Sequence, residues 1–272
     1  MGLRHDGTPV EQTAVNEWEQ DEVDETSVPF EPFKDLCKRR FLWYYESYLA
    51  AIEKGKTEVT ENQPFKAMPF ESPTRNTMDG AFKYPDLEKR LKRIKAALDE
   101  EPQTWAKAGI ESALAETRVS VNLKHQFGQV LTSLKSGDMP HNVALEDGNP
   151  FVWTLTYFGR PMTNFDSGVI RIKMHFSTRF PEEQPRVRLE TKIFHHLVAP
   201  DGTMCYTPNP SKSEDVRSHI DAIIMALEDD EPPYDPRKIV NLEANQLFWN
   251  GGPENKKLYH RRLRRSVQDS LE

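Results

Sequence analysis

The stretch FVWTLTYFGRPMTNFDSGVIRIKMHF, residues 151–176, decides the fold of this chain. Apolar and polar residues alternate through Phe151–Phe158 and again through Gly168–Phe176, and a period of two is typical of strands with one buried face. The connection between them begins with the turn sequence Gly159-Arg160-Pro161 and is short. Parallel strands need a crossover of about a dozen residues or more, so we expect this pair to be antiparallel.

Two further strand patterns flank this pair, Asn142–Glu146 before it and Arg186–Glu190 after it. Turn signals separate all four, so their chain order predicts an antiparallel meander. Helical periodicity surrounds the strands in four stretches: Val119–Leu134, Asp215–Glu228, Pro236–Trp249 and Pro253–Leu271. The predicted fold class is therefore α+β, with a four-stranded antiparallel meander sheet flanked by helices.

The chain divides into three predicted segments. Residues 1–29 are polar, acidic and unpatterned, which predicts a disordered tail. Residues 30–117 carry helical patterns and a loop-like linker, and are interpreted as a helical extension. Residues 118–272 hold the α+β domain.

The extension contains predicted helices at Pro32–Lys54 and Asp86–Glu100, and Pro102 is placed to start a new helix. Its first helix is rich in aromatic residues: Phe33, Phe41, Trp43, Tyr44, Tyr45 and Tyr48. Aromatic side chains mostly fill cores, so this face is expected to pack on the domain or within the extension. The other hypothesis is a docking site for one dedicated partner, such as a ligase or scaffold.

Composition limits the function classes. The net charge of −7 argues against nucleic acid as the main partner, because phosphate binding needs a basic face. No apolar run is long enough to span a membrane. The two cysteines form no C-x-x-C pair, and no metal-ligand spacing occurs, so neither a disulfide framework nor a metal or cofactor is expected. These features favour a cytoplasmic or nuclear protein.

The long irregular stretch Phe194–Pro210 is the predicted functional loop, because long loops in compact domains are often functional. It contains His195, His196 and Cys205. A lone cysteine is most often a small buried hydrophobe. Cys205, however, follows the turn sequence Asp201–Met204, so its thiol need not be buried.

Five short pieces connect this loop to a known family. They are Gly159-Arg160-Pro161, Phe180-Pro181-Glu182-Glu183-Gln184-Pro185, Thr191-Lys192-Ile193-Phe194-His195, Gly202-Thr203-Met204-Cys205-Tyr206 and Asp235-Pro236. In this order, over roughly Val119–Leu271, the chain resembles the ubiquitin-conjugating (E2) family. That family has a Gly-Pro turn, a Tyr-Pro…Pro-Pro element, a Thr-Lys-Ile-Tyr-His-Pro-Asn run, a Gly-x-Ile-Cys-Leu active site and an Asp-Pro-Leu turn.

The resemblance implies a conjugating enzyme. Such an enzyme accepts ubiquitin or a ubiquitin-like protein from an E1 activating enzyme, holds it as a thioester on cysteine and passes it to a substrate amine. By position, Cys205 would be the nucleophile and Asp235 the acidic residue that helps the incoming lysine lose its proton. Asp235 also suits the role of a simple helix cap before Pro236. ATP would be used by the activating enzyme, and this chain would need no cofactor.

Three positions depart from the family pattern. Leu197 stands where the family has the Asn thought to steady the loop or the oxyanion, and His196 beside it is a hypothetical substitute donor. Thr207 stands where many members have Asp. Glu182 and the polar Ser211–Glu214 replace the apolar ligase-docking residues, which predicts poor binding to generic RING ligases.

Two other functions remain open. One is a non-catalytic adaptor on the same fold, which Leu197 favours and Cys205 opposes. The other is a cysteine hydrolase with a Cys205–His pair, which would cleave amides or esters without an activating enzyme.

Overall fold

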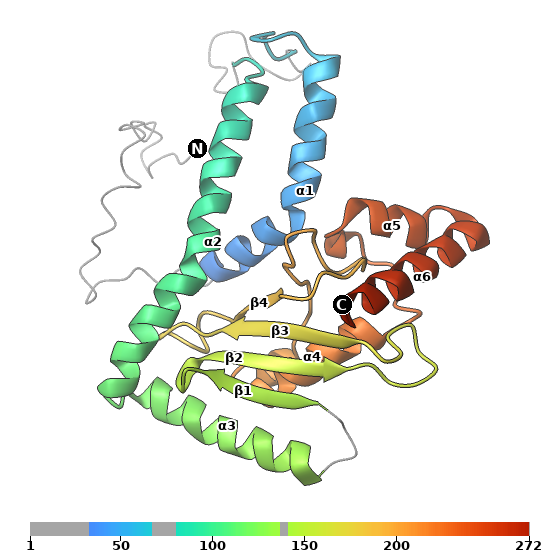
Figure 1. Ribbon diagram of the computed structural model, residues 1–272. Helices are drawn as coiled ribbons and strands as arrows, with labels where there is room; N and C mark the ends of the chain where they lie inside the picture. Colours follow the sequence, from blue (N-terminus) through green and yellow to red (C-terminus); the bar gives the residue numbers. More distant parts are fainter. Residues whose placement is uncertain (1–32, 67–79, 137–140, 272) are drawn as a thin grey trace. The chain divides into compact units, whose positions relative to one another are not determined.

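The computed structural model describes residues 33–66, 80–136 and 141–271 (Figure 1). The chain divides into two units, Met1–Lys34 and Asp35–Glu272. The helices of the extension therefore cluster with the α+β domain from Asp35 onward. The predicted tail at 1–29 lies outside the described residues.

The sheet has four antiparallel strands in the order β1-β2-β3-β4, as predicted. Their bounds are β1 Asn142–Glu146, β2 Asn149–Phe158, β3 Val169–His175 and β4 Arg186–Leu189. The register pairs Trp153 with Met174 and Ile172 with Leu189. The observed strands lie within two residues of the predicted ones, because their alternating pattern marks one buried face.

The core lies between that face and the helices. The inward side chains of β2 and β3 have no exposed surface: Trp153, Leu155, Tyr157, Ile170, Ile172 and Met174. They form one cluster with α4, Val216–Glu228, which crosses the sheet in Figure 1 and which Asp215 caps by accepting the Arg217 N–H. The other helices of this domain are α3 Arg118–Ser136, α5 Leu242–Trp249 and α6 Gly252–Gln268.

Two helix predictions are wrong. α2 runs unbroken over Tyr84–Leu114 and contains Pro102, where a new helix was expected. The interior proline is tolerated because tertiary contacts hold the helix on both sides of it, through Glu101 to Arg186 and through the buried Trp105. The predicted helix Pro236–Trp249 is instead a 3₁₀ turn followed by α5, because Asn241 starts a new helix by accepting the Ala244 N–H at 3.0 Å.

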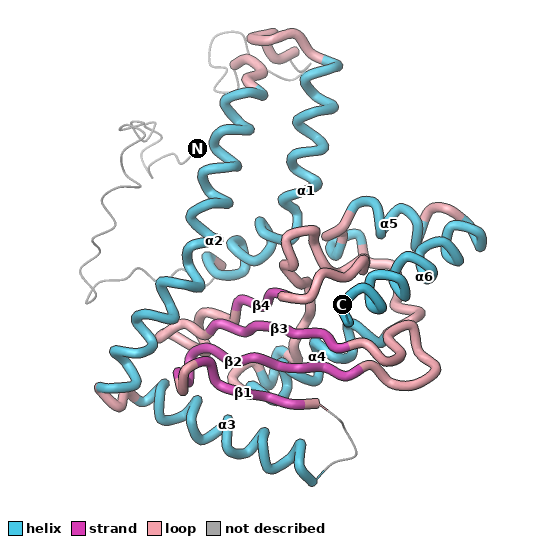
Figure 2. The backbone as a smooth tube through the Cα atoms, in the orientation of Figure 1, coloured by secondary structure: helices cyan, strands magenta, loops and turns pink. Residues whose placement is uncertain are grey.

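The extension consists of α1, Lys34–Glu58, and α2, which run side by side in Figures 1 and 2. Side chains join them, because the Tyr84 ring lies over Gly55 and Lys56 pairs with Glu88. A Cβ at Gly55 would lie 2.3 Å from the Tyr84 ring, so this close approach requires glycine. In the part of the chain described, no helix has the length and apolar character needed to cross a membrane.

Candidate functional site

The predicted loop is held by backbone contacts at Cys205 and at the residue before it. The Cys205 N–H donates to the Leu197 carbonyl at 2.9 Å, and the Met204 N–H donates to the Val187 carbonyl of β4 at 3.2 Å. Gly202 turns the chain between these segments with φ +88°. A Cβ at Gly202 would lie 2.3 Å from the Leu189 carbonyl oxygen, so only glycine fits this turn.

Cys205 itself is buried, with 0% of its surface exposed. Its neighbours form a small apolar cluster of Trp43, Leu197, Ala199 and Val240. Burial raises the pKa of the Cys205 thiol to about 12, while the positive charges of Lys238 and Arg40 act to lower it. The thiol that the sequence suggested could be accessible is therefore covered and protonated in this structure.

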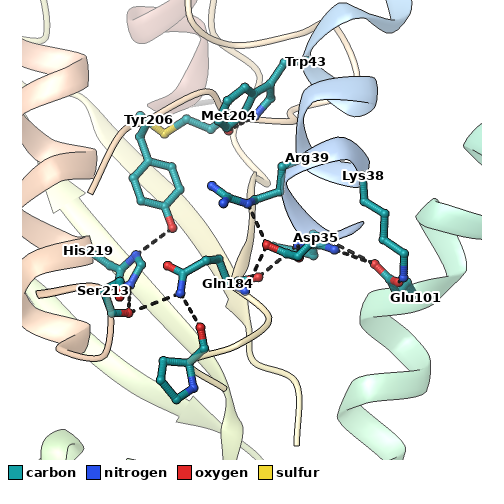
Figure 3. Close-up of polar contacts among 12 residues, drawn as sticks. Asp35, Lys38, Arg39, Trp43, Glu101, Gln184, Met204, Tyr206, Ser213 and His219 are labelled. Atoms are coloured by element: carbon teal, nitrogen blue, oxygen red, sulfur yellow. Dashed lines mark hydrogen bonds and ion pairs between the residues drawn. The ribbon is translucent and has the colours of Figure 1, made fainter. Parts of the chain in front are cut away.

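The cover comes from α1. Trp43 shares one apolar cluster with Cys205. Its indole Nε1–H donates to the Met204 carbonyl at 3.1 Å (Figure 3). Trp43 therefore packs on the domain, as expected for the aromatic helix, whereas Phe33 is 69% exposed and Tyr48 is 40% exposed. The cover was missed because it comes from a helix more than 150 positions away from Cys205.

A groove of about 520 Å³ lies next to Cys205, and its lining residues include Cys205 but not Trp43. Its walls come from the loop after Cys205, from α4 and from the segment before α5. Four carboxylates and three cations line it: Asp215, Asp221, Asp229, Asp235, Lys212, Arg217 and Lys238. Two hydrogen bonds of His219 hold the loop after Cys205 (Figure 3). His219 Nδ1 lies 2.9 Å from the Tyr206 hydroxyl, and His219 Nε2 lies 2.9 Å from the Ser213 carbonyl oxygen.

Asp235 lies in the wall of this groove. It caps the 3₁₀ turn Pro236–Lys238 by accepting the Arg237 N–H at 3.0 Å, which confirms the capping role. It also accepts from the Arg237 guanidinium at 2.9 and 3.1 Å. These hydrogen bonds lower the pKa of Asp235, so its carboxylate stays charged. Its part in lysine deprotonation stays a prediction.

His196 also lines the groove, but its ring belongs to an aromatic cluster. It stacks on Phe248 at 4.6 Å, and its Nδ1 is 2.9 Å from the Tyr259 hydroxyl. Burial lowers the pKa of His196 to about 4, so the ring is neutral at physiological pH. Its role as an oxyanion donor stays a prediction.

The Cys–His pairing of a hydrolase has no support in the geometry. His195 Nδ1 accepts the Leu197 N–H at 3.2 Å. Burial holds the pKa of His195 well below its usual value. Among the described residues, no hydrogen bond joins Cys205 to either histidine, so no base is positioned to activate the thiol as in that class. Within the same residues, no cluster of three or more His, Cys, Asp or Glu side chains could hold a metal ion.

Two asparagines that sequence reasoning missed brace the loop. Asn245 Nδ2 donates to the His196 carbonyl at 2.9 Å, and Asn241 Nδ2 donates to the Val198 carbonyl at 3.2 Å. Both are buried, and they secure the backbone on either side of Leu197. An Asn just before an apolar stretch is a helix-start signal that could have identified Asn241; Asn245 carries no such signal.

The residues that depart from the family pattern have distinct surroundings. Leu197 is buried against Cys205 and Trp43, so an apolar side chain suits it here. Thr207 is exposed beside the groove. The Glu182 side chain is 74% exposed and lies 3.4 Å from Arg179, which leaves a charge on the surface at that position.

Comparisons with known proteins agree with this architecture. The family model described as ubiquitin-conjugating enzyme matches residues 126–240, which include Cys205 and Asp235. Ubiquitin-conjugating enzyme E2 2 of Neurospora crassa is 26% identical over 164 residues, 59% of this chain and 99% of that protein. Ubiquitin-conjugating enzyme E2 3 of Arabidopsis thaliana is 27% identical over 127 residues, 47% of this chain and 81% of that protein.

A solved structure is also similar. A Plasmodium yoelii protein, assigned as a ubiquitin conjugating enzyme, aligns with a TM-score of 0.44 at 16% identity. The alignment covers 56% of this chain and 95% of that one.

Proposed function

Since this chain is a divergent member of the ubiquitin-conjugating enzyme family, we propose that it carries ubiquitin or a ubiquitin-like protein as a thioester on Cys205. The observation that supports this most directly is the placement of Cys205. It lies within the matched segment, at the end of a groove that a peptide tail could occupy. The surrounding charges from Lys238 and Asp235 belong to that same groove.

The chemistry has two transfers. In the first, the Cys205 thiolate attacks the thioester carbonyl of the modifier on the activating enzyme, a new C–S bond forms and the activating enzyme's thiol leaves. In the second, a substrate amine attacks the Cys205 thioester, an amide forms, the amine loses its proton and the Cys205 thiol leaves. The chain itself needs no cofactor, and ATP is used by the activating enzyme.

Local charges would assist both transfers. Lys238 and Arg40 favour the thiolate form of Cys205, since each acts to lower its pKa. The Asp235 carboxylate is charged, so it would attract and orient an incoming ammonium rather than store its proton. With Leu197 in place of the family's Asn, the loop is braced by Asn241 and Asn245 instead.

The test is a charging assay on the full chain. It is incubated with activating enzyme, ATP and labelled ubiquitin, and in parallel with ubiquitin-like modifiers, and then run on a non-reducing gel. A reducible adduct that Cys205→Ala abolishes and Cys37→Ala retains is the expected result, because Cys37 lies exposed on α1. An adduct that persists in Cys205→Ala, or no adduct with any modifier, would overturn the proposal.

A non-catalytic adaptor is the second candidate, and the burial of Cys205 is the observation that favours it. It predicts binding of a ubiquitin-pathway protein that is unchanged by Cys205→Ala. Isothermal titration against the modifier and the activating enzyme separates the two functions, provided that it is paired with the charging assay.

Ligase selectivity is expected to be narrow. The exposed Glu182 and the polar 3₁₀ turn Pro210–Lys212 put charge where relatives present apolar side chains. Discharge of the charged protein should therefore respond weakly to unrelated RING domains. Robust stimulation by several of them would contradict this prediction, and Glu182→Leu should increase any weak response.

A further inference from the structure

The helix that covers Cys205 is not part of the segment that the family model matches. The match begins at residue 126, whereas α1 ends at Glu58. The nucleophile of the proposed reaction is thus closed by an element that is added to the conjugating domain. Cys205 is also one of the residues around the domain's groove, although none of its surface is exposed there.

The contact that closes Cys205 is made by Trp43 of α1, within the apolar cluster around the cysteine. Trp43 is 8% exposed and shares one apolar cluster with Cys205. The indole N–H is satisfied by the carbonyl of Met204, the residue that precedes the nucleophile. The packing and the hydrogen bond together hold the Trp43 indole against the segment that carries Cys205.

The start of α1 is anchored to the domain independently of Trp43. Arg186 of β4 lies between Asp35 of α1, at 2.7 Å, and Glu101 of α2, at 2.9 Å. Lys38 of α1 also pairs with Glu101. These contacts join the first turns of the helix to β4 and α2, so the Trp43 contact could open while the helix stays attached.

We infer that α1 is an autoinhibitory cap, in which Trp43 keeps Cys205 closed until the middle of α1 moves away from the catalytic loop. The inference rests on the proposed function, because a cap matters only if Cys205 reacts. Thioester exchange requires the sulfur to come within about 3–3.5 Å of the carbonyl carbon of the incoming thioester. A cysteine with no exposed surface cannot meet that carbon, so charging needs an open form.

Alkylation of the full chain tests the cap without any ubiquitin chemistry. Iodoacetamide is added at neutral pH, and the two cysteines are followed by peptide mass spectrometry. Cys37 is exposed and serves as an internal standard. We expect Cys205 to react at least ~100-fold more slowly than Cys37, since it reacts only during local opening and only as thiolate. Equal rates for the two cysteines would overturn the cap.

Variants separate local opening from general loss of stability. Trp43→Ala should raise the Cys205 rate by ~10-fold or more, and Trp43→Phe, which keeps a ring but loses the indole N–H, should fall between it and the parent. Leu123→Ala removes a buried side chain of α3 that belongs to the main core cluster. It should leave Cys205 protected. A rate in Leu123→Ala equal to that in Trp43→Ala would show general unfolding and refute the cap.

The charging assay then distinguishes failure of the cap from failure of the function. If the cap is right, Trp43→Ala should form the Cys205 thioester several-fold faster than the parent at a fixed concentration of activating enzyme. If Trp43→Ala is alkylated rapidly at Cys205 but forms no thioester, then Trp43 does cover the cysteine and the proposed enzymatic function is wrong. Thioester formation at the same rate in the parent and Trp43→Ala would retain the enzyme and reject the cap.

Discussion

At the level of single residues, Asn245 is a buried side chain that braces the loop before Cys205. Its Nδ2 donates to the His196 and Asn241 carbonyls at 2.9 and 2.8 Å, and it is buried. Asn245→Ala should lower the free energy of unfolding by about 1–2 kcal/mol, because two buried carbonyls would each lose one hydrogen bond. Urea unfolding measures this. Gln246→Ala, the exposed neighbour on α5, should change it by less than about 0.5 kcal/mol.

Leu197 gives a second prediction, because the family's own residue should not suit this site. Leu197→Asn would place an amide in the apolar cluster of Trp43, Ala199 and Cys205. We expect a loss of about 1–3 kcal/mol in the free energy of unfolding. Leu197→Met, which keeps an apolar side chain of similar volume, should lose less than about 1.5 kcal/mol. An asparagine variant as stable as the parent would show that the loop offers the amide partners after all.

The residues of the site differ in how far sequence predicts them. Motifs that are local in sequence single out Cys205 and Asp235 as candidates, and the capping role of Asp235 follows from the proline after it. The burial of Cys205 could not be found in this way, because Trp43 reaches it only through tertiary packing. No spacing rule connects a tryptophan on one helix to a loop in another part of the chain.

At the level of elements, the attachment of α1 and α2 to the sheet depends on one buried cation. Arg186 is 7% exposed, pairs with Asp35 and Glu101, and lies over the Trp105 ring at 4.7 Å. Arg186→Met should lower the free energy of unfolding by about 1.5–3 kcal/mol, because Asp35 and Glu101 would each lose a buried charge-assisted contact but keep a second cation, Arg39 or Lys38. Urea unfolding of the full chain measures the change.

Arg188 supplies the matched control on the same strand. Its guanidinium pairs with Asp99 at 2.8 Å, but both side chains are more than one-third exposed. Arg188→Met should therefore lower the free energy of unfolding by less than about 1 kcal/mol. If both variants lose the same free energy of unfolding, then the burial of Arg186 with Asp35 and Glu101 does not add to stability.

Elements with a strong period were predicted well, and those decided by tertiary contacts were not. The four strands alternate apolar and polar residues, so their limits could be read closely from sequence. Pro102 normally disfavours a helix interior, yet α2 passes through it. The contacts of Glu101 and Trp105 with Arg186 outweigh that local cost, and a contact with a distant strand has no local signal.

At the level of the whole molecule, buried neutral histidines predict loss of stability in acid. Burial lowers the pKa of His175 and of His196 to about 4. Below about pH 6.5, the unfolded chain binds protons at these histidines that the folded chain does not bind. The free energy of unfolding therefore keeps its full histidine contribution above about pH 6.5 and falls as the pH drops toward 4. For His196, the difference between 6.5 and about 4 corresponds to about 3 kcal/mol.

Urea unfolding at several pH values between 7 and 4 checks this. His196→Gln should show a shallower fall in the free energy of unfolding than the parent, because one titrating group is removed. His125→Gln is the control, since His125 is exposed on α3. Parallel curves for His196→Gln and the parent would contradict the assignment of acid sensitivity to His196.

The bond between Trp43 and Met204 also fixes an order of events in synthesis, because its partners are 161 positions apart. At ribosomal rates of ~5–20 residues per second, α1 leaves the ribosome about 10–30 s before the loop that it covers has been made. Trp43 lacks its native hydrogen-bond acceptor during that interval. The helix is thus made early but can complete its contact with the loop only late, so we expect chaperones to reach Trp43 in a nascent chain although it is buried in the finished protein.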